Sequence, residues 1–241
     1  MEEIYEQIKI IYEDKNYLIV YKPYNLTVHK PNIKYPFPTL ADFLIQKYPE
    51  LKNVGDDPIL RPRIVHRLDK ETSGIMLIPR NQDAYNYYKK LFKNGKIVKK
   101  YYVLVHGNVY NDFEVDKPTM RSKTDGAKFC TPALNTPYYN QAKNALTKFE
   151  VIKNYKGFCL LRAIPKTGRT HQIRVHLQSV SRIAAGDKLY KPKKFQTPRK
   201  LNRLFLHAYY LGFKDQNGNK VEYKIGLPKD LSDFLKTLQD K

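Results

Sequence analysis

The stretch that decides the fold is His66-Arg-Leu-Asp-Lys-Glu-Thr-Ser-Gly74, which continues into the apolar run Ile75-Met-Leu-Ile-Pro79. An apolar run bounded by glycine and proline predicts a core strand with the charged residues at its entrance. Arg67 precedes Asp69 and Lys70 follows it, and neighbouring cations favour the charged form of a carboxylate. We therefore expect an ionised Asp69 that could act as a nucleophile, although on this segment alone a structural carboxylate paired with an arginine is the commoner case.

Apolar and β-branched runs elsewhere predict further strands, which come in neighbouring pairs. The predicted strands cover residues 8–12, 17–21, 74–80, 97–105, 145–152, 158–164, 205–213 and 220–225. Helices are predicted after Thr39, from Asn81 to a stop at Gly95, over 170–179, and along a C-terminal stripe with Leu231 and Phe234. Paired strands favour an α+β fold, a mixed, mainly antiparallel sheet flanked by helices and loops. With 241 residues we expect a single domain over 1–241, with room for two lobes.

The net charge restricts the class of partner. Lys and Arg number 44 and Asp and Glu number 23, which gives a formal charge of +21. Such an excess favours a polyanion, with nucleic acid as the leading candidate, over a small acidic metabolite. The acidic N-terminus and the lack of a long apolar run in the sequence predict neither a signal peptide nor a membrane span. We expect a cytoplasmic protein without a membrane partner and, without an obvious apolar stripe, a monomer.

The Cys and His residues do not have the spacing of a metal site. Cys130 and Cys159 lie 29 positions apart, which indicates neither a disulfide framework nor a thiolate site. His171 and His176 belong to the segment Gly168-Arg-Thr-His-Gln-Ile-Arg-Val-His176 and are five residues apart, too far round a helix for adjacent ligation. We therefore expect no metal.

The same segment carries two arginines, Arg169 and Arg174. They are also five residues apart, so they cannot share one narrow helix face. One can reach inward to a carboxylate while the other meets solvent or phosphate, and the spacing alone leaves open which does which.

Two basic segments are candidate nucleic-acid surfaces. Residues 188–203 hold seven Lys or Arg and no acid, interleaved with Tyr190 and Phe195, and residues 89–102 offer the same mixture. Cations neutralise phosphates while exposed rings stack on unpaired bases, so two such segments favour RNA or DNA over a solvated lysine-rich face. The residues from these segments that we expect to contact RNA are Lys99, Lys100, Lys188, Lys191, Lys193 and Lys194.

Together, four segments resemble the RluA-type family of RNA pseudouridine synthases over nearly the whole chain. They are Tyr12-Glu-Asp14 through Lys22-Pro23, His66-Arg-Leu-Asp69 with Thr72-Ser-Gly74, Lys99-Lys-Tyr101, and Gly168 to His176. The resemblance implies the catalytic fold of that family around a central RNA-binding cleft, and an isomerisation of uridine that uses neither metal nor cofactor. It also implies that Asp69 is the catalytic aspartate, that Tyr101 lies against the target base, and that Arg174 is the basic partner that holds Asp69.

The implied reaction leaves several roles open. Asp69 could attack the sugar or the base, or act as a base on the ribose, and the sequence does not choose among these routes. The reacting nucleotide must leave its stack, so His66 and Arg67 are candidates to fill the gap or to hold its phosphate, and Arg169 is a further candidate RNA contact. Gly186-Asp187 and Leu189-Tyr190 fall where the family has similar residues, and we expect them to give mainly structural support.

Two features depart from the family pattern. The usual Pro-x-Gly is Pro23-Tyr24-Asn25 here, and Asn is the residue that, after Gly, best tolerates a positive φ. The sequence also leaves no room for the small N-terminal RNA-binding module of many members, so we expect the catalytic domain without it.

The choice of RNA and two rival functions stay open at this point. The basic segment 188–203 favours ribosomal RNA of the large subunit, and transfer RNA is the alternative. A non-catalytic RNA-binding or ribosome-assembly factor would use the same basic surface, but it would not need Asp69, Tyr101 and Arg174 together. A retaining glycosidase needs paired carboxylates, and the acid nearest to Asp69 in the sequence is Glu71.

Overall fold

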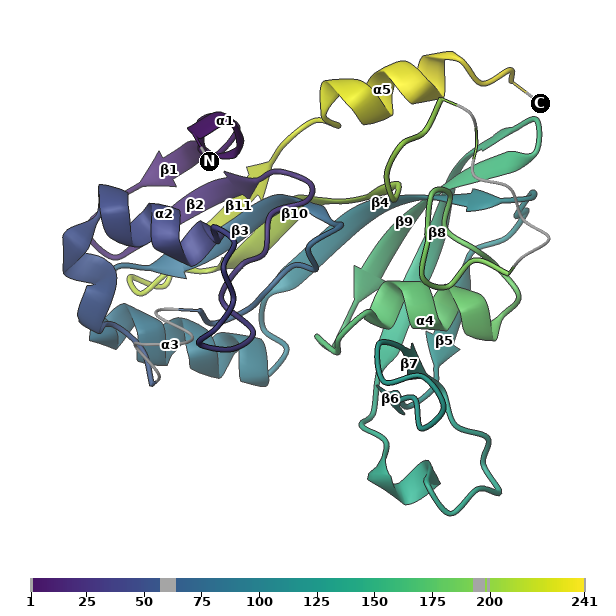
Figure 1. The fold of residues 1–241 in the computed structure, drawn as a ribbon, viewed down its shortest axis with the longest axis horizontal. Coiled ribbons are helices and arrows are strands. Elements are labelled where there is room, and N and C mark those ends of the chain that lie inside the picture. Colours follow the sequence, from purple (N-terminus) through teal and green to yellow (C-terminus); the bar gives the residue numbers. More distant parts are fainter. Residues whose placement is uncertain (1, 57–63, 193–197, 199, 241) are drawn as a thin grey trace. The chain divides into compact units, whose positions relative to one another are not determined.

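A computed structural model describes residues 2–56, 64–192, 198 and 200–240 (Figure 1). The chain forms two compact units, Met1–Val98 with Ala208–Ile225, and Lys99–His207 with Gly226–Lys241. Both units combine helices with antiparallel strand pairs, so the predicted α+β class with a mainly antiparallel sheet is confirmed. No helix in the described ranges is long and apolar enough to cross a membrane. The single catalytic domain stays a prediction.

The first unit is a sheet with helices packed on it. Its elements are α1 (Glu2–Glu6), β1 (Lys9–Glu13), β2 (Tyr17–Lys22), α2 (Leu40–Lys47), a 3-10 helix (Pro49–Asn53), β3 (Ser73–Pro79), α3 (Gln82–Lys93), most of β10 (Leu206–Lys214), and β11 (Lys220–Lys224). The strands adjoin in the order β1-β2-β3-β10-β11. Every residue of β3 is buried, which confirms the core strand expected after Gly74.

Short-range signals set the ends of these elements. The Thr39 hydroxyl accepts the amide of Asp42, whose carboxylate accepts the amide of Thr39, and this reciprocal pair begins α2. Gly95 has a φ of 65° just after α3, the left-handed conformation that ends helices and that glycine adopts without strain. The predicted helix starts after Thr39 and Asn81, and the predicted stop at Gly95, are thus confirmed.

The second unit contains a run of neighbouring antiparallel strands and one long segment that leaves them. Its elements are β4 (Val98–His106), β5 (Phe113–Asp116), β6 (Met120–Arg121), β7 (Phe129–Cys130), a 3-10 helix (Tyr139–Gln141), β8 (Leu146–Tyr155), β9 (Phe158–Pro165), α4 (Gln172–Ser179) and α5 (Lys229–Lys236). The strands adjoin in the order β4-β9-β8-β5, and β6 pairs with β7 as a separate hairpin. In Figure 1 the segment between β5 and β8 extends beyond the sheet and carries this hairpin.

The structure differs from the sequence-based prediction at α4 and in the segment between β5 and β8. The helix begins at Gln172 rather than at residue 170, because His171 has a φ of 55° and cannot belong to a right-handed helix. The elements α1, β5, β6 and β7 were not predicted. Each has five residues or fewer, too short for a periodic pattern to emerge.

Two glycines allow close approach of distant segments, one in each unit. A Cβ added to Gly74 would lie 2.2 Å from the carbonyl oxygen of Ala208, and one added to Gly186 would lie 1.9 Å from that of Arg203. Both residues also have positive φ angles, 139° and 75°. These positions therefore admit only glycine without a shift of the backbone.

Candidate active site

The loop that carries Asp69 is a tight turn tied to the end of β2. The amide of Thr72 donates to the Asp69 carbonyl at 3.0 Å, and the carbonyl of Lys70 accepts the amide of Asn25 at 2.9 Å. Asp69 itself is half-buried. Its backbone is thus held by hydrogen bonds from two segments that are far apart in the sequence, as a positioned reactive group requires.

The buried side chain of Lys22 links the turn after β2 to the loop that carries Asp69. Its side chain is fully buried, and its Nζ donates to the carbonyls of Pro23 at 2.8 Å, Leu26 at 2.9 Å and Lys70 at 3.4 Å. A buried ammonium needs such acceptors, because burial without them is costly. Lys22-Pro23 belongs to a segment that resembles the family, but nothing in the local sequence pattern predicts the contact with Lys70.

Asn25 occupies the turn position where the family has glycine. Its φ is 66°, so the expectation that asparagine tolerates a positive φ here is confirmed. We predict that Asn25→Ala lowers the free energy of unfolding by about 1–2 kcal/mol, the cost of a left-handed conformation for a residue with a Cβ and no local hydrogen bond. Asn25→Gly should leave it within about 0.5 kcal/mol of wild type. Urea unfolding of the three proteins measures both, and equal midpoints for Ala and Gly would contradict the strain argument.

His66 and Arg67 have different surroundings in the first unit. His66 stacks on Phe92 with ring centroids 4.3 Å apart, and its Nε2 accepts the amide of Leu77 at 3.0 Å. Arg67 is exposed, and its Nη1 donates to Nε2 of the buried His29 at 3.4 Å. His66 therefore supports β3, while Arg67 keeps a solvent-facing position. Contact of either residue with RNA stays a prediction.

In the second unit, Arg174 forms a buried salt bridge with Asp187. Its Nε and Nη2 donate to the two carboxylate oxygens, each at 2.7 Å, and both side chains are 1% exposed. Asp187 Oδ1 also accepts the amides of Leu189 and Tyr190, each at 2.9 Å. The inward-facing arginine of the motif is thus Arg174. The sequence predicts a carboxylate partner for one of the two arginines but does not identify Asp187, and the pairing of Arg174 with Asp69 stays a prediction.

Tyr190 connects this salt bridge to the β6–β7 hairpin. The guanidinium carbon of Arg174 lies 5.0 Å from the centre of the Tyr190 ring. The Tyr190 hydroxyl accepts the amide of Phe129, in β7, at 2.9 Å and shares a hydrogen bond of 2.9 Å with Nδ1 of His171. One buried tyrosine therefore touches the salt bridge, the start of α4 and the hairpin.

We predict that Tyr190→Phe loosens the hairpin and leaves the core intact. The ring still packs under Arg174, but the Phe129 amide loses its acceptor, which corresponds to about 0.5–1.5 kcal/mol. Amide hydrogen exchange at Phe129 should become faster, while exchange in β9 should not change. Tyr138→Phe is the matched control, because Tyr138 is 44% exposed. An unchanged exchange rate at Phe129 would show that the hydroxyl does not hold the hairpin.

Gln172 fixes the first turn of α4. Its Oε1 accepts the hydroxyl of Thr167 at 2.7 Å and the amide of Arg169 at 2.9 Å. Its Nε2 donates to the Leu146 carbonyl at 3.0 Å and to the Thr147 hydroxyl at 2.9 Å. These contacts use both polar ends of a buried amide, so they orient the helix that carries Arg174.

The remaining predicted residues of the second unit differ in exposure. Tyr101 is half-buried on β4 and packs against the core formed by Val103, Phe149 and their neighbours. Lys99 is buried, and desolvation lowers its pKa to about 8. Lys100 is half-buried, whereas Arg169 is exposed and donates through Nε to the Asn144 carbonyl at 3.0 Å. Contact of Lys99, Lys100 and Arg169 with RNA stays a prediction.

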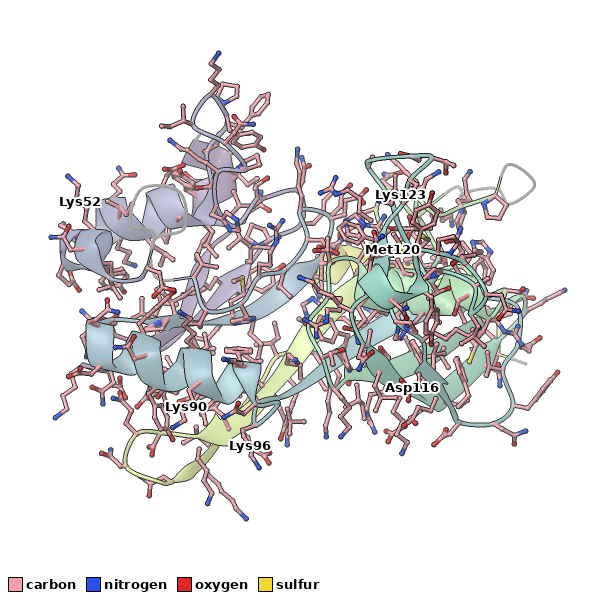
Figure 2. The ribbon with its side chains drawn as sticks, turned by 90° about the horizontal axis from the view of Figure 1, so that it is seen from below. Lys52, Lys90, Lys96, Asp116, Met120 and Lys123 are labelled. Carbon is pink, nitrogen blue, oxygen red and sulfur yellow. The ribbon has the colours of Figure 1, made fainter. Side chains whose placement is uncertain are left out.

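The basic segments are only partly described. Lys188 is exposed and Lys191 half-buried, whereas Lys193 and Lys194 lie outside the described residues. On the first unit, Lys90 and Lys96 are exposed (Figure 2). Near the β6–β7 hairpin, Lys123 lies over the ring of Tyr138 at 5.2 Å, a pairing of cation and exposed aromatic ring. Contact of Lys188 and Lys191 with RNA stays a prediction.

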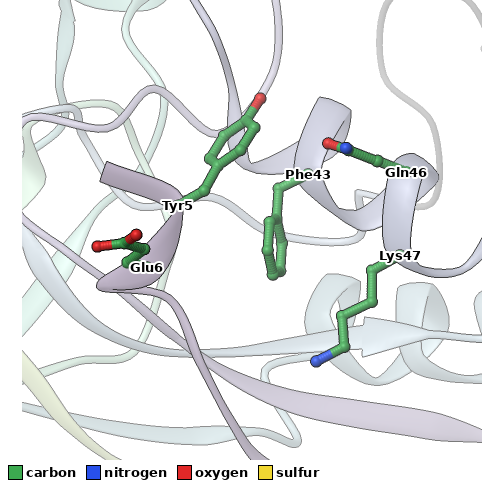
Figure 3. A pocket seen from close by; sticks show the side chains of 5 residues that line it. All are labelled: Tyr5, Glu6, Phe43, Gln46 and Lys47. Carbon is green, nitrogen blue, oxygen red and sulfur yellow. The ribbon is translucent and has the colours of Figure 1, made fainter. Parts of the chain in front are cut away.

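A cavity in the first unit lies away from the predicted site residues. A cavity of about 460 Å³ between α1 and α2 is lined by Tyr5, Glu6, Phe43, Gln46 and Lys47 (Figure 3), and no predicted site residue is among them. In the ranges that the structure describes, no three His, Cys, Asp or Glu side chains could hold a metal ion. His176 is buried and bonds Thr147 Oγ1 at 2.9 Å, and desolvation lowers its pKa.

The predicted catalytic residues belong to different units. Asp69 lies in the first unit with its supporting residues Lys22 and Asn25, and Tyr101 and Arg174 lie in the second. Within each unit, the structure shows which hydrogen bonds and salt bridges hold these residues in place. That Asp69 meets Tyr101 and Arg174 stays a prediction.

Comparison with known proteins gives consistent matches. The family model described as RNA pseudouridylate synthase matches residues 16–179. The chain is 33% identical over 234 residues to "Uncharacterized RNA pseudouridine synthase YlyB" of Bacillus subtilis, covering 96% of this chain and 73% of that protein. It is 33% identical over 239 residues to "Ribosomal large subunit pseudouridine synthase D" of Buchnera aphidicola from Acyrthosiphon pisum, covering 95% and 72%. The structure of "Human RNA Pseudouridylate Synthase Domain Containing 4" superposes with a TM-score of 0.74 at 25% identity, covering 98% and 94%.

Proposed function

Given that this chain belongs to the RNA pseudouridylate synthase family and converts uridine to pseudouridine in RNA, we propose that its substrate is the ribosomal RNA of the large subunit. The observation that carries this proposal is the 33% identity, over 95% of the chain, to a protein named as a large-subunit ribosomal synthase. The charge of +21 supports a large polyanionic substrate. We place the enzyme in the cytoplasm, as a monomer that binds this RNA.

We propose that Asp69 performs the central step. The bond between C1′ of the ribose and N1 of uracil breaks, the base rotates, and a bond forms between C1′ and C5. The proton on C5 then leaves and N1 gains a proton, so no atom is added or lost overall. An anionic Asp69 can attack the sugar or the base, or remove a proton from the ribose, and its turn holds it in place for each of these routes.

In the same proposal, Tyr101 and Arg174 act on the base and on Asp69. Tyr101 offers a flat ring to stack on uracil and a phenol that can assist proton transfer from C5. The Asp187 carboxylate holds the Nε and Nη2 edge of Arg174. The guanidinium of Arg174 would pair with the carboxylate of Asp69. Arg67 and Arg169, both exposed, would bind backbone phosphates.

Pseudouridine mapping tests the choice of RNA. Ribosomal and transfer RNA are compared from cells that contain the wild-type protein, Asp69→Asn, or no copy of the gene. We expect one or more sites in large-subunit ribosomal RNA to disappear in both altered strains. Loss of a site in transfer RNA instead would show that transfer RNA, and not ribosomal RNA, is the substrate. No changed uridine, together with RNA that copurifies with both proteins, would identify a non-catalytic RNA-binding factor.

A further inference from the structure

We propose that residues 29–38 form a stacking platform for an unpaired base next to the reacting uridine, with Phe37 as the ring on which that base rests. The inference deepens the proposed function, because it names the part of the RNA that this loop recognises. It assigns a binding site to a segment that no motif covers.

The first observation is the exposure of two large apolar side chains in one short loop. Phe37 is 61% exposed and Ile33 is 75% exposed, and both lie in the ten residues that precede α2. Tyr35 stands edge-on to Phe37, with ring centroids 5.4 Å apart. Exposed apolar groups that cluster in this way, rather than singly, are typical of a surface that a partner covers.

The loop is also rigid in a way that suits binding. Pro31, Pro36 and Pro38 restrict its backbone. The side chain of Asn32 accepts the amide of Lys34 at 3.0 Å, and the Tyr35 and Thr27 hydroxyls share a hydrogen bond of 3.0 Å. An aromatic ring on a backbone that is already ordered loses little entropy when a base stacks on it.

Both cations that flank Asp69 touch this loop, which places it beside the proposed nucleophile. The Nζ of Lys70 lies 6.0 Å from the centre of the Phe37 ring, and Nη1 of Arg67 donates to Nε2 of His29 at 3.4 Å. Lys70 follows Asp69 directly in the chain, so this contact brings Phe37 to the segment that carries the proposed nucleophile.

The charge of the loop selects RNA as the occupant. Residues 27–41 contain Lys30 and Lys34 and no acidic residue. Lys30 pairs with Asp42 at 3.6 Å, and Lys34 is exposed. Exposed rings among cations bind single-stranded nucleic acid with little dependence on sequence, because every base has a flat face. When the target uridine leaves its stack, the adjacent base loses a neighbour, and Phe37 would replace that neighbour.

The test combines a protein change with an RNA change. Purified wild-type protein, Phe37→Leu and Phe37→Tyr are compared on a hairpin with a uridine that the wild type converts, and on the same hairpin with abasic nucleotides beside that uridine. We expect Phe37→Leu to raise KM by about tenfold or more with kcat nearly unchanged, since stacking on an aromatic ring contributes a factor of this size. Phe37→Tyr keeps a ring and should resemble wild type. On the abasic hairpin, the KM of the wild type should rise by the same factor. The KM of Phe37→Leu should hardly rise further.

A matched control and a binding measurement separate the possible failures. Tyr110→Leu removes a ring that is 70% exposed in the second unit and should not change KM. If the effects of Phe37→Leu and of the abasic nucleotides are simply additive, the platform is wrong, although the enzyme still converts uridine. If ribosomal hairpins are not converted and transfer RNA hairpins are, the proposed substrate fails, and the same comparison on transfer RNA still decides the platform. If no hairpin reacts, the anisotropy of fluorescent hairpins with and without abasic sites gives the RNA affinities of wild type and Phe37→Leu. These affinities then show whether the protein change and the abasic change are coupled.

Discussion

Asp69→Asn should reduce pseudouridine formation by about a thousandfold or more in a single-turnover assay, as expected when the group that forms or breaks bonds in the reaction is removed. The amide has nearly the shape of the carboxylate but carries no charge, so it can neither attack nor take up a proton. The turn should survive, because it is held by backbone groups: the Asp69 carbonyl accepts the Thr72 amide, and the Lys70 carbonyl accepts the Asn25 amide.

Two comparisons make the result specific to the carboxylate of Asp69. Glu71→Gln removes the nearest acid in the sequence from the same turn and should keep near wild-type activity. RNA affinity and the urea midpoint of Asp69→Asn should stay close to those of wild type, which separates lost chemistry from lost binding or folding. Substantial turnover by Asp69→Asn would show that another group carries the reaction.

Asp187→Ala should lower the free energy of unfolding by about 3–5 kcal/mol, the usual cost when one partner of a buried ion pair is removed. The guanidinium of Arg174 would stay buried without its carboxylate, and the amides of Leu189 and Tyr190 would lose their acceptor. Activity should fall as well, because the proposed orientation of Arg174 toward Asp69 depends on this salt bridge. Urea unfolding and a single-turnover assay on the still-folded protein measure the two effects.

Milder variants distinguish the charge from the hydrogen bonds. Asp187→Asn keeps an oxygen for the amides of Leu189 and Tyr190 but removes the charge, so its stability should lie between wild type and Asp187→Ala. Asp233→Ala removes an exposed carboxylate paired with Lys229 and Lys236 and should hardly shift the urea midpoint. If Asp187→Ala is as mild as Asp233→Ala, the buried salt bridge does not stabilise the second unit.

The residues that could be predicted are those whose partners are near in the sequence. Thr39 and Asp42 form a capping box within one helical turn, and the strand that follows Gly74 is apolar because it is buried on both faces. The family segments His66–Gly74 and Gly168–His176 could likewise be recognised, because each is continuous in the sequence. His66 lies in one of these segments, but its role could not be predicted. Its contacts with Leu77 and Phe92 support β3, and no periodic pattern reveals them.

The sequence alone therefore establishes the α+β class, the start of α2, both ends of α3, most strand positions, the family, and Asp69 as the proposed catalytic residue, because such features depend on local pattern and chemical type. Tertiary contact is needed for the rest. The salt bridge of Arg174 with Asp187 spans 13 residues, the contact of Lys22 with Lys70 spans 48, and that of Phe129 with Tyr190 spans 61. A buried polar group takes whichever partner the folded chain brings within about 3 Å, and only the packing of distant segments decides which partner that is.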